Sequence, residues 1–270
     1  HRDGSLTSAL DVLVSGEDDG EVRRVSLTNA GRRTREIEIT SYAELVLTGA
    51  DTDAAHPVFA KMFVETEYLP EFGALVATRR ARSADETPMW VAHFAVVEGE
   101  TIAEPQWETD RSHFRGRSRP LAAAAVLVDG RPLSGTVGTV LDPIFSLRLR
   151  VAVPSGRPTR VAFWTVVAPS RAELLTLIDT HHDRSAFDRA KTLAGGERRM
   201  PHRFHRSVLG GVVGRRRSAS RRHRHGVARD PSGARGRGAR PALHPALRQN
   251  NPRSRLHPWL STGAARERRP

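Results

Sequence analysis

Four short stretches of this sequence hold side chains that could do chemistry, and two of them suggest a metal site. The acidic run 17-EDDGE-21 could hold a cation. It lacks the ligand spacing of a calcium-binding hand and precedes a strand pattern, so we interpret it as a solvated turn. His181-His182-Asp183 could hold a transition metal. Adjacent side chains on a helix point about 100° apart, so the two imidazoles cannot easily share an ion, and we interpret them as a polar helix terminus.

The other two stretches suggest phosphate binding and glycoside hydrolysis. The glycine-containing stretch 135-GTVGTVLDP-143 lacks the Lys and Ser/Thr of a phosphate-binding loop, so we predict a turn between strands. Glu65 and Glu67 stand two residues apart on one face of a predicted strand. A glycosidase needs two carboxyl groups on opposite sides of the sugar with separated pKa values, so we interpret this pair as a solvated strand face.

The composition excludes several classes of protein. Cysteine is absent from the 270 residues, which excludes disulfide bonds, thiolate zinc sites and thiol redox chemistry, and which suits a reducing compartment. No run of about 18 apolar residues is present, so no transmembrane segment is predicted. The chain begins with His1-Arg2-Asp3-Gly4, without an initiator methionine or a signal peptide, and we expect it to be part of a longer protein.

Strand patterns fill the first two thirds of the chain, and they predict an all-β fold. Short runs of alternating apolar and polar residues are separated by Gly, Pro and Asp turns. In 36-EIEITSYAELVL-47, Ile37, Ile39 and Tyr42 are predicted to face away from the glutamates. In 150-RVAVPSGRPTRVAFW-164 a Pro-Ser-Gly turn predicts a hairpin. The predicted strands are 9–14, 21–28, 35–47, 58–68, 74–79, 90–97, 123–128, 145–153 and 160–167.

The pattern changes to a helical one near residue 170. Ser170 and Glu173 form a capping box before leucines at helical spacing, and Ser185 with Asp188 marks a second start. Strands in series followed by helices indicate a large antiparallel β-sandwich that leads into helical structure. We therefore predict three parts: a β-sandwich over 1–169, a helical linker over 170–194 and a tail over 195–270.

The tail carries the positive charge of the chain. Residues 195–270 hold 20 Arg and 3 acidic residues, a net charge of +17, whereas residues 1–194 have a net charge of −4. The tail lacks Lys, Ile and Tyr, so we predict disorder and attribute the composition to a GC-rich gene read in a shifted frame. The alternative is an arginine arm that binds nucleic acid. Only Phe204 and Trp259 could stack on bases, so nucleic acid is not the partner we expect.

Several motifs resemble one family of carbohydrate-active proteins. The stretches 90-WVAHFAVVEGE-100, 105-PQWETDRSHFRGR-117 and 132-PLSGTVGTVLDPIFSLR-148 are similar to the β-sandwich region of glycoside hydrolase family 94, especially that of bacterial cyclic β-1,2-glucan synthases. The similarity covers nearly all of residues 5–194. It implies a supersandwich of two antiparallel sheets, here without its N-terminal strands, followed by a helical linker to an (α/α)6 barrel. The barrel, which is not in this sequence, carries the family's general acid and phosphate site.

The resemblance also implies candidate sugar-binding residues. In the family's phosphorylases the segment matching 56-HPVFAKMF-63 carries a Gln-Arg pair that reaches the acceptor-sugar subsite. Here the pair is Ala60 and Lys61, so the amide is lost and a cation is kept. Lys61 could donate to a sugar hydroxyl, and Trp107, Arg111 and Arg117 could line the same face, because aromatic planes and guanidinium groups are common sugar partners. The alternatives are that Lys61 is an ordinary surface lysine and that the 107–117 segment has only a packing role.

These observations predict a part of a cyclic β-1,2-glucan synthase or sugar phosphorylase type of protein. We expect it to bind an oligosaccharide or β-glucan, to pack against the barrel, and to have no catalytic residue, metal or cofactor of its own. The resemblance implies a cytoplasmic location for this chain and a bacterial inner-membrane location for the longer protein. A non-enzymatic carbohydrate-binding β-sandwich is the second hypothesis, and a nucleic-acid binder that uses the arginine tail is the third.

Overall fold

The structure is a computed structural model, and it describes residues 1–81, 86–196 and 212–214. Its helical elements are α1 Ala50–Ala55, α2 Pro57–Lys61, α3 Arg111–Arg115, η1 Leu121–Ala123, α4 Ala125–Val128, α5 Arg171–His181 and α6 Ala186–Gly196. Its strands are β1 Arg2–Asp3, β2 Leu6–Val14, β3 Gly20–Asn29, β4 Arg35–Ser41, β5 Ala43–Glu44, β6 Val64–Leu69, β7 Ala74–Arg79, β8 Trp90–Glu98, β9 Glu100–Thr101, β10 Gln106–Asp110, β11 Gly138–Thr139, β12 Pro143–Val153, β13 Thr159–Ala168 and β14 Val212–Gly214.

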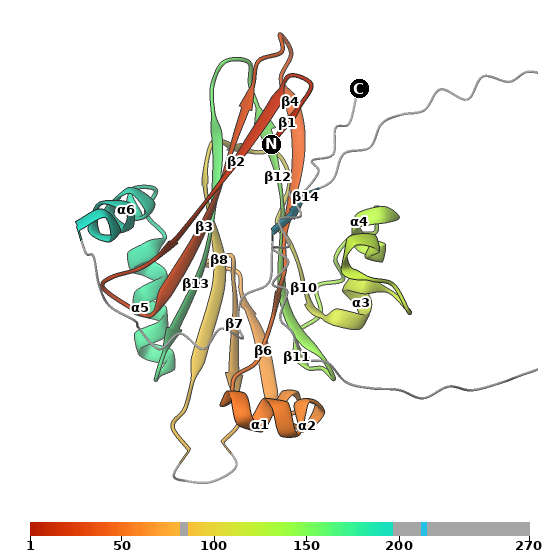
Figure 1. The fold of residues 1–270 in the computed structure, drawn as a ribbon, viewed down its shortest axis with the longest axis vertical. Coiled ribbons are helices and arrows are strands. Elements are labelled where there is room, and N and C mark those ends of the chain that lie inside the picture. Colours follow the sequence, from red (N-terminus) through yellow and green to blue (C-terminus); the bar gives the residue numbers. More distant parts are fainter. Residues whose placement is uncertain (82–85, 197–211, 215–270) are drawn as a thin grey trace, which may run out of the picture. The chain divides into compact units, whose positions relative to one another are not determined.

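The strands form two antiparallel sheets that face each other (Figure 1). The first sheet has eight strands in the order β1-β2-β3-β13-β8-β7-β6-β11. The second has the order β10-β12-β4-β14, and β5 and β9 also pair with β12. The predicted fold, an antiparallel β-sandwich followed by helices, is confirmed.

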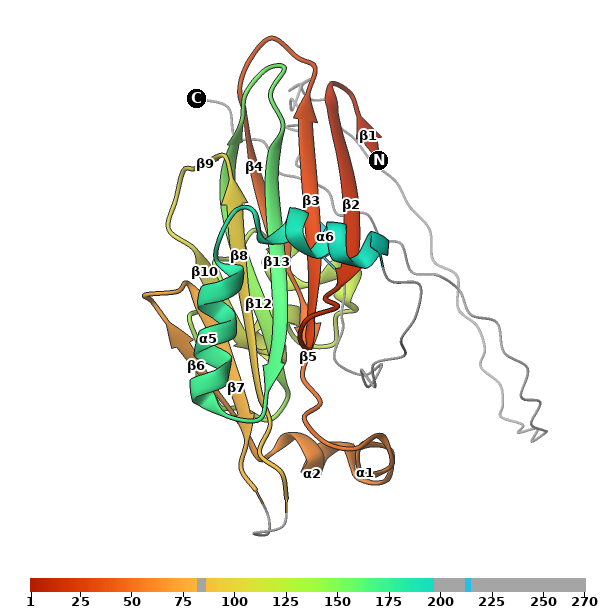
Figure 2. The same ribbon diagram turned by 90° about the vertical axis from the view of Figure 1, so that its left-hand side faces the viewer.

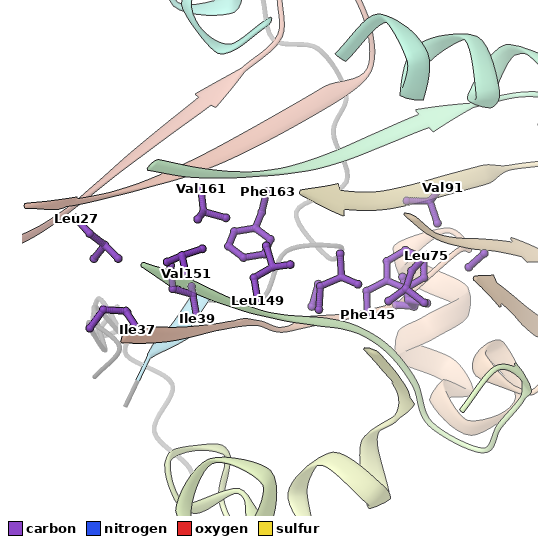
Figure 3. Close-up of a cluster of buried hydrophobic side chains, with 14 of the residues drawn as sticks. Leu27, Ile37, Ile39, Leu75, Val91, Phe145, Leu149, Val151, Val161 and Phe163 are labelled. Carbon is purple, nitrogen blue, oxygen red and sulfur yellow. The ribbon is translucent and has the colours of Figure 1, made fainter. Parts of the chain in front are cut away.

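The main core lies between the two sheets, where alternate residues of each strand point inward (Figure 3). In β12, Phe145, Leu147, Leu149 and Val151 are all buried in this core, which is the two-residue period of a strand. Burial of each such side chain stabilises the fold by roughly 1.5–3 kcal/mol. The alternation that predicted the strands is therefore the pattern that builds this core.

The helices α5 and α6 cover the outer face of the first sheet (Figure 2). The capping box is confirmed: the Ser170 hydroxyl accepts a hydrogen bond from the backbone N–H of Glu173 at 3.2 Å and donates to its carboxylate at 2.9 Å. Leu174, Ile178 and Phe187 are buried against the sheet. The segment predicted as a linker therefore shares a hydrophobic core with the sandwich.

Two predicted strands are wrong in whole or in part. Residues 123–128 lie in η1 and α4, because the alanine run 122-AAAA-125 favours helix and the buried residues pack with Phe114 beside the second sheet. Residues 58–61 belong to α2, which begins with a proline, and the strand starts only at Val64. The predicted strand over 35–47 is divided into β4 and β5.

The segment 150–164 is not a hairpin, because its two strands belong to different sheets. β12 pairs with β10 and β4, whereas β13 pairs with β3 and β8. The Pro154-Ser155-Gly156 turn does reverse the chain, but it carries the chain across the sandwich. Tyr42 is also placed differently from the prediction: it is buried beside Phe114, in a cluster other than the one that holds Ile37 and Ile39.

One part of the tail contacts the sandwich. Val212–Gly214 forms β14, which pairs with β4 over Ile39–Ser41. Valine favours strands, and β4 presents backbone groups to β14 on the side away from β12. Residues 195 and 196 end helix α6, and the remainder of the predicted disordered tail lies outside the described residues. No helix in the described ranges is both long and apolar enough to span a membrane.

Candidate sugar-binding site

Lys61 is the last residue of a short helix and not a strand residue. The helix α2 begins with Pro57, whose missing N–H costs nothing at this position. The Lys61 side chain is only 15% exposed, and its Nζ donates to Oδ1 of Asp142 at 2.8 Å. Lys61 is therefore fixed by an ion pair with the segment that precedes β12.

Arg111 binds the other oxygen of the same carboxylate. It is the first residue of α3, a helix whose N-cap Asp110 accepts a hydrogen bond from the backbone N–H of Ser112 at 2.7 Å. The Arg111 guanidinium donates to Oδ2 of Asp142 at 2.7 Å, and its backbone N–H donates to the Asp142 carbonyl at 3.1 Å. Asp142 thus holds Lys61 and Arg111 together.

A second carboxylate extends this cluster. Glu44 Oε1 lies 3.0 Å from Nη2 of Arg111 and accepts a hydrogen bond from the Tyr42 hydroxyl at 2.9 Å. We call the five residues Tyr42, Glu44, Lys61, Arg111 and Asp142 the ion-pair cluster. Its two cations and two carboxylates balance in charge, and the four charged side chains are between 15% and 39% exposed.

The surroundings of the ion-pair cluster keep the Asp142 carboxyl group ionised. Burial acts to raise the pKa of Asp142, but the hydrogen bonds and positive charges of Lys61 and Arg111 outweigh it and lower that pKa. Burial and the nearby Glu44 charge raise the pKa of the Tyr42 hydroxyl. Asp142 is therefore ionised at neutral pH and is a poor general acid.

This arrangement suits binding better than acid–base catalysis. The Lys61 ammonium has three N–H donors and the Arg111 guanidinium has five, so both have donors beyond the bonds described here. Carboxylates of Asp142 and Glu44 offer acceptors beside them. Partly exposed donors and acceptors in fixed positions are what a sugar hydroxyl needs. No group of three or more potential metal ligands occurs in the described residues.

Comparison with known proteins shows the family of the chain. Residues 1–184 match the profile of the glycosyl hydrolase 94 supersandwich domain. The chain belongs to this family. It is also 43% identical over 185 residues to the cyclic beta-(1,2)-glucan synthase NdvB of Rhizobium meliloti strain 1021. That match covers 68% of this chain and 6% of the relative, so the chain spans a small part of the relative's length.

Trp107 lies in the packing between the sheets of this supersandwich domain. Its ring stacks on Tyr68 with a centroid distance of 3.7 Å and an angle of 10°, and both side chains pack against the main core. The stack closes the sandwich where β10 and β6 lie near the edges of their sheets. The structure therefore does not bring Trp107 into the ion-pair cluster, and structural packing, the alternative for this residue, fits the geometry better.

Two other residues of the 107–117 motif differ in exposure: one is buried and bonds to the backbone, and the other lies on the surface. Glu108 is buried, and its carboxylate accepts hydrogen bonds from the backbone N–H groups of Thr109 and Asp110 at 3.0 and 2.9 Å. Arg117 is exposed in the loop that follows α3 and is not part of the ion-pair cluster. Among the four candidate residues, the structure therefore brings together Lys61 and Arg111.

Sequence reasoning missed Asp142, Glu44 and Tyr42. Asp142 is in the stretch 135–143 that was interpreted as a turn, and the stretch does form a loop with the short strand β11. Nothing in the local sequence shows that the carboxylate faces α2 and α3. The position of Asp142 just before a predicted strand is the signal that the sequence offers.

The glutamate pair on β6 is exposed as predicted. In the two stretches that suggested a metal site, Asp18 and His181 are more buried than predicted. Glu65 and Glu67 are both exposed, and Glu67 pairs with Arg171 at 3.0 Å. In the acidic run, Asp18 accepts a hydrogen bond from Nε2 of His181 at 2.6 Å. His181 is the last residue of α5, so the predicted helix terminus is confirmed, but the side chain is 5% exposed and stacks on Trp164.

His182 turns away from its neighbour. Its ring stacks on Phe94 with a centroid distance of 5.6 Å, while that of His181 stacks on Trp164 at 4.1 Å. The expectation that the two adjacent imidazoles point in different directions agrees with this geometry. Both rings contribute to the packing of α5 on the first sheet.

Proposed function

We propose that this chain is the sugar-binding and scaffolding part of a protein of the cyclic β-1,2-glucan synthase or sugar phosphorylase type. It contributes Lys61 and Arg111 to the subsite for the acceptor sugar and has no catalytic group of its own. The proposal includes an oligosaccharide or β-glucan as ligand, an (α/α)6 barrel as the domain that completes the site, a cytoplasmic location for this chain and an inner-membrane location for the longer protein.

The ion-pair cluster is the observation that carries this proposal. Lys61 and Arg111 belong to two separate motifs that predict sugar binding, and one carboxylate holds both side chains. The exposed apolar residues Val58, Phe59 and Met62 on and beside α2 support the docking of another domain next to the cluster. The identity of 43% to a cyclic glucan synthase supports the class of ligand.

Kinetics of a full-length relative with lysine at the matching position test this proposal. There, the substitution corresponding to Lys61→Ala removes one charged donor to a sugar hydroxyl. A hydrogen bond to a charged group contributes about 1.5–3 kcal/mol, so we expect acceptor affinity to weaken by roughly ten-fold to a hundred-fold. In the 270-residue chain alone, the effect on sugar binding should be small, because the barrel's half of the subsite is absent.

The matched control is the substitution corresponding to Glu67→Gln, which removes a carboxylate from an exposed ion pair on β6. This control should leave acceptor affinity unchanged. Unchanged acceptor use in the lysine variant would show that Lys61 is only a surface lysine.

A further inference from the structure

A lysine and an arginine side by side ordinarily favour an anionic ligand. The Lys61 ammonium is a compact point charge, and the Arg111 guanidinium is a planar fork that fits carboxylate and phosphate groups. Both side chains are partly exposed, at 15% and 26%. Taken alone, this pair of cations would therefore predict a sugar that carries a carboxylate or a phosphate.

The two carboxylates of the ion-pair cluster reverse this prediction. Asp142 accepts one donor from each cation, at 2.8 and 2.7 Å, and Glu44 lies 3.0 Å from a second nitrogen of Arg111. The positive and negative charges of the cluster therefore cancel. An anion that approached Lys61 or Arg111 would also meet Asp142, which is 33% exposed between the two cations.

Hydrogen bonds fix the positions of both carboxylates relative to the cations. Asp142 comes directly before β12, and its carbonyl accepts a hydrogen bond from the backbone N–H of Arg111 at 3.1 Å. Glu44 pairs with Ile144 near the start of the same strand, and its carboxylate accepts from the Tyr42 hydroxyl at 2.9 Å. A ligand therefore meets the carboxylates together with the cations.

A sugar hydroxyl suits this mixed surface because it both donates and accepts hydrogen bonds. Lys61 uses one of its N–H groups on Asp142, and each outer nitrogen of Arg111 carries a further N–H beyond its ion pair. The inner nitrogen of Arg111, Nε, is buried, so the guanidinium meets a ligand through its outer nitrogens. Neighbouring hydroxyls of an uncharged sugar can then bond a cation and a carboxylate at the same time.

We propose that the ion-pair cluster selects uncharged sugars, and that Asp142 determines this selectivity by rejecting sugars that carry a carboxylate or a phosphate. This inference rests on the proposed function, because it names the class of sugar that Lys61 and Arg111 bind. Its physical basis is the charge at one position. Asparagine at that position would keep the size and an oxygen acceptor of the side chain, but would leave two cations with a single carboxylate.

NMR titration of the 270-residue chain with a matched pair of sugars tests this selectivity. The probes are methyl β-D-glucoside and methyl β-D-glucuronide, which differ by a carboxylate in place of a hydroxymethyl group. The backbone amide signals of Lys61 and Arg111 report binding at the cluster itself, so association of the glucuronide with arginines elsewhere does not enter the measurement. Both affinities will be low without the barrel's half of the subsite, so the ratio between them is compared. We expect the unaltered chain to prefer the glucoside by about three-fold or more.

Asp142→Asn should change this preference. Removal of one charge close to the ligand should strengthen glucuronide binding by about ten-fold, while glucoside binding changes by less than about three-fold. The gain should disappear when Lys61→Ala is added, because an anion and a cation are then both removed. Glu44→Gln removes the other carboxylate and should strengthen glucuronide binding in the same direction, which keeps the test independent of the folding of Asp142→Asn.

Glu67→Gln is the matched control. It makes the same change in the net charge of the chain, but at an exposed ion pair on β6, and it should leave the preference unchanged. An unchanged preference in Asp142→Asn and Glu44→Gln, or a gain that Glu67→Gln reproduces, would overturn this inference. A glucoside that moves neither amide signal in the unaltered chain would instead contradict the proposed function, and a glucuronide gain in Asp142→Asn would then still support the role of Asp142 in rejecting anions.

Discussion

At the residue scale, the candidate site depends on a single carboxylate that binds two cations. Asp142 accepts from Lys61 on one oxygen and from Arg111 on the other, so it determines the spacing between the two side chains. Its lowered pKa keeps it charged throughout the neutral range. The cluster is therefore a preformed set of donors whose geometry is fixed before any ligand arrives.

Removal of this shared charge should destabilise the fold moderately. In Asp142→Asn, Lys61 and Arg111 lose their common anion and face each other as like charges. Partly exposed ion pairs contribute little individually, so we expect the free energy of unfolding in urea to fall by about 1 kcal/mol. Glu67→Gln is the matched control and should change it by less than about 0.5 kcal/mol. An equal effect of the two substitutions would show that the cluster is an ordinary surface ion pair.

His93 should make stability depend on pH. Its ring is buried between Phe145 and Phe163, and its nitrogens bond with Ser41 at 2.8 Å and Thr165 at 3.0 Å. Burial lowers its pKa to about 4, below the 6.5 of the unfolded chain. The unfolded state binds the proton first, so stability is complete above pH 6.5 and falls as the pH drops toward 4.

Urea unfolding at pH 7 and pH 5 measures this effect. We expect the free energy of unfolding to be lower at pH 5 by about 2 kcal/mol. His93→Gln keeps a polar side chain in the core without a titrating ring, and it should remove most of this difference even if it is less stable at both pH values. A pH difference that persists in His93→Gln would assign the titration to another group.

The sequence could predict the cations of the site but not its anions. Lys61 and Arg111 stand in motifs with a family resemblance, so each could be chosen without a structure. Asp142 and Glu44 have no such motif, because their role depends on how β5 and the start of β12 meet α2 and α3. Trp107, by contrast, was predicted as a site residue but does not join the cluster. An aromatic ring suits a sugar, yet Tyr68 on the other sheet already covers the face of this ring.

At the element scale, local signals predicted the strands more successfully than their partners. Pro154-Ser155-Gly156 reverses the chain whether the next strand pairs with the previous one or crosses to the other sheet, so it could not distinguish a hairpin from a crossing. Residues 123–128 are short and apolar, and such runs fit a buried helix as well as a strand. The capping box of α5 was predictable because Ser170 and Glu173 interact within one turn.

Helices α5 and α6 should contribute strongly to the stability of the sandwich. Leu174 is fully buried between α5 and the first sheet, so Leu174→Ala should lower the free energy of unfolding by about 3 kcal/mol through lost contacts and a cavity. The control Leu193→Ala changes a leucine that is 39% exposed on α6 and should cost less than about 1 kcal/mol. A loss below 1 kcal/mol for Leu174→Ala would make α5 a detachable linker.

At the scale of the whole molecule, the described residues form a supersandwich with three apolar clusters. One lies between the sheets, one under α5 and α6, and one between α3, α4 and the second sheet. Asp18, Asp142 and Asp183 have lowered pKa values, so these three carboxyl groups are ionised at neutral pH. General acid catalysis at neutral pH requires a raised value. The three lowered values agree with the proposal that this chain binds a sugar and scaffolds the longer protein.

Incubation of the purified 270-residue chain with a β-1,2-gluco-oligosaccharide and phosphate tests this central claim most directly. Glucose 1-phosphate is the product to be measured, because phosphorolysis of a glucosidic bond releases it. We predict no formation above a blank without protein, since under this proposal the chain supplies donors for a sugar and the barrel supplies the acid that protonates the leaving oxygen. Turnover that is lost in Asp142→Asn or Lys61→Ala would contradict the account, because the ion-pair cluster would then be catalytic.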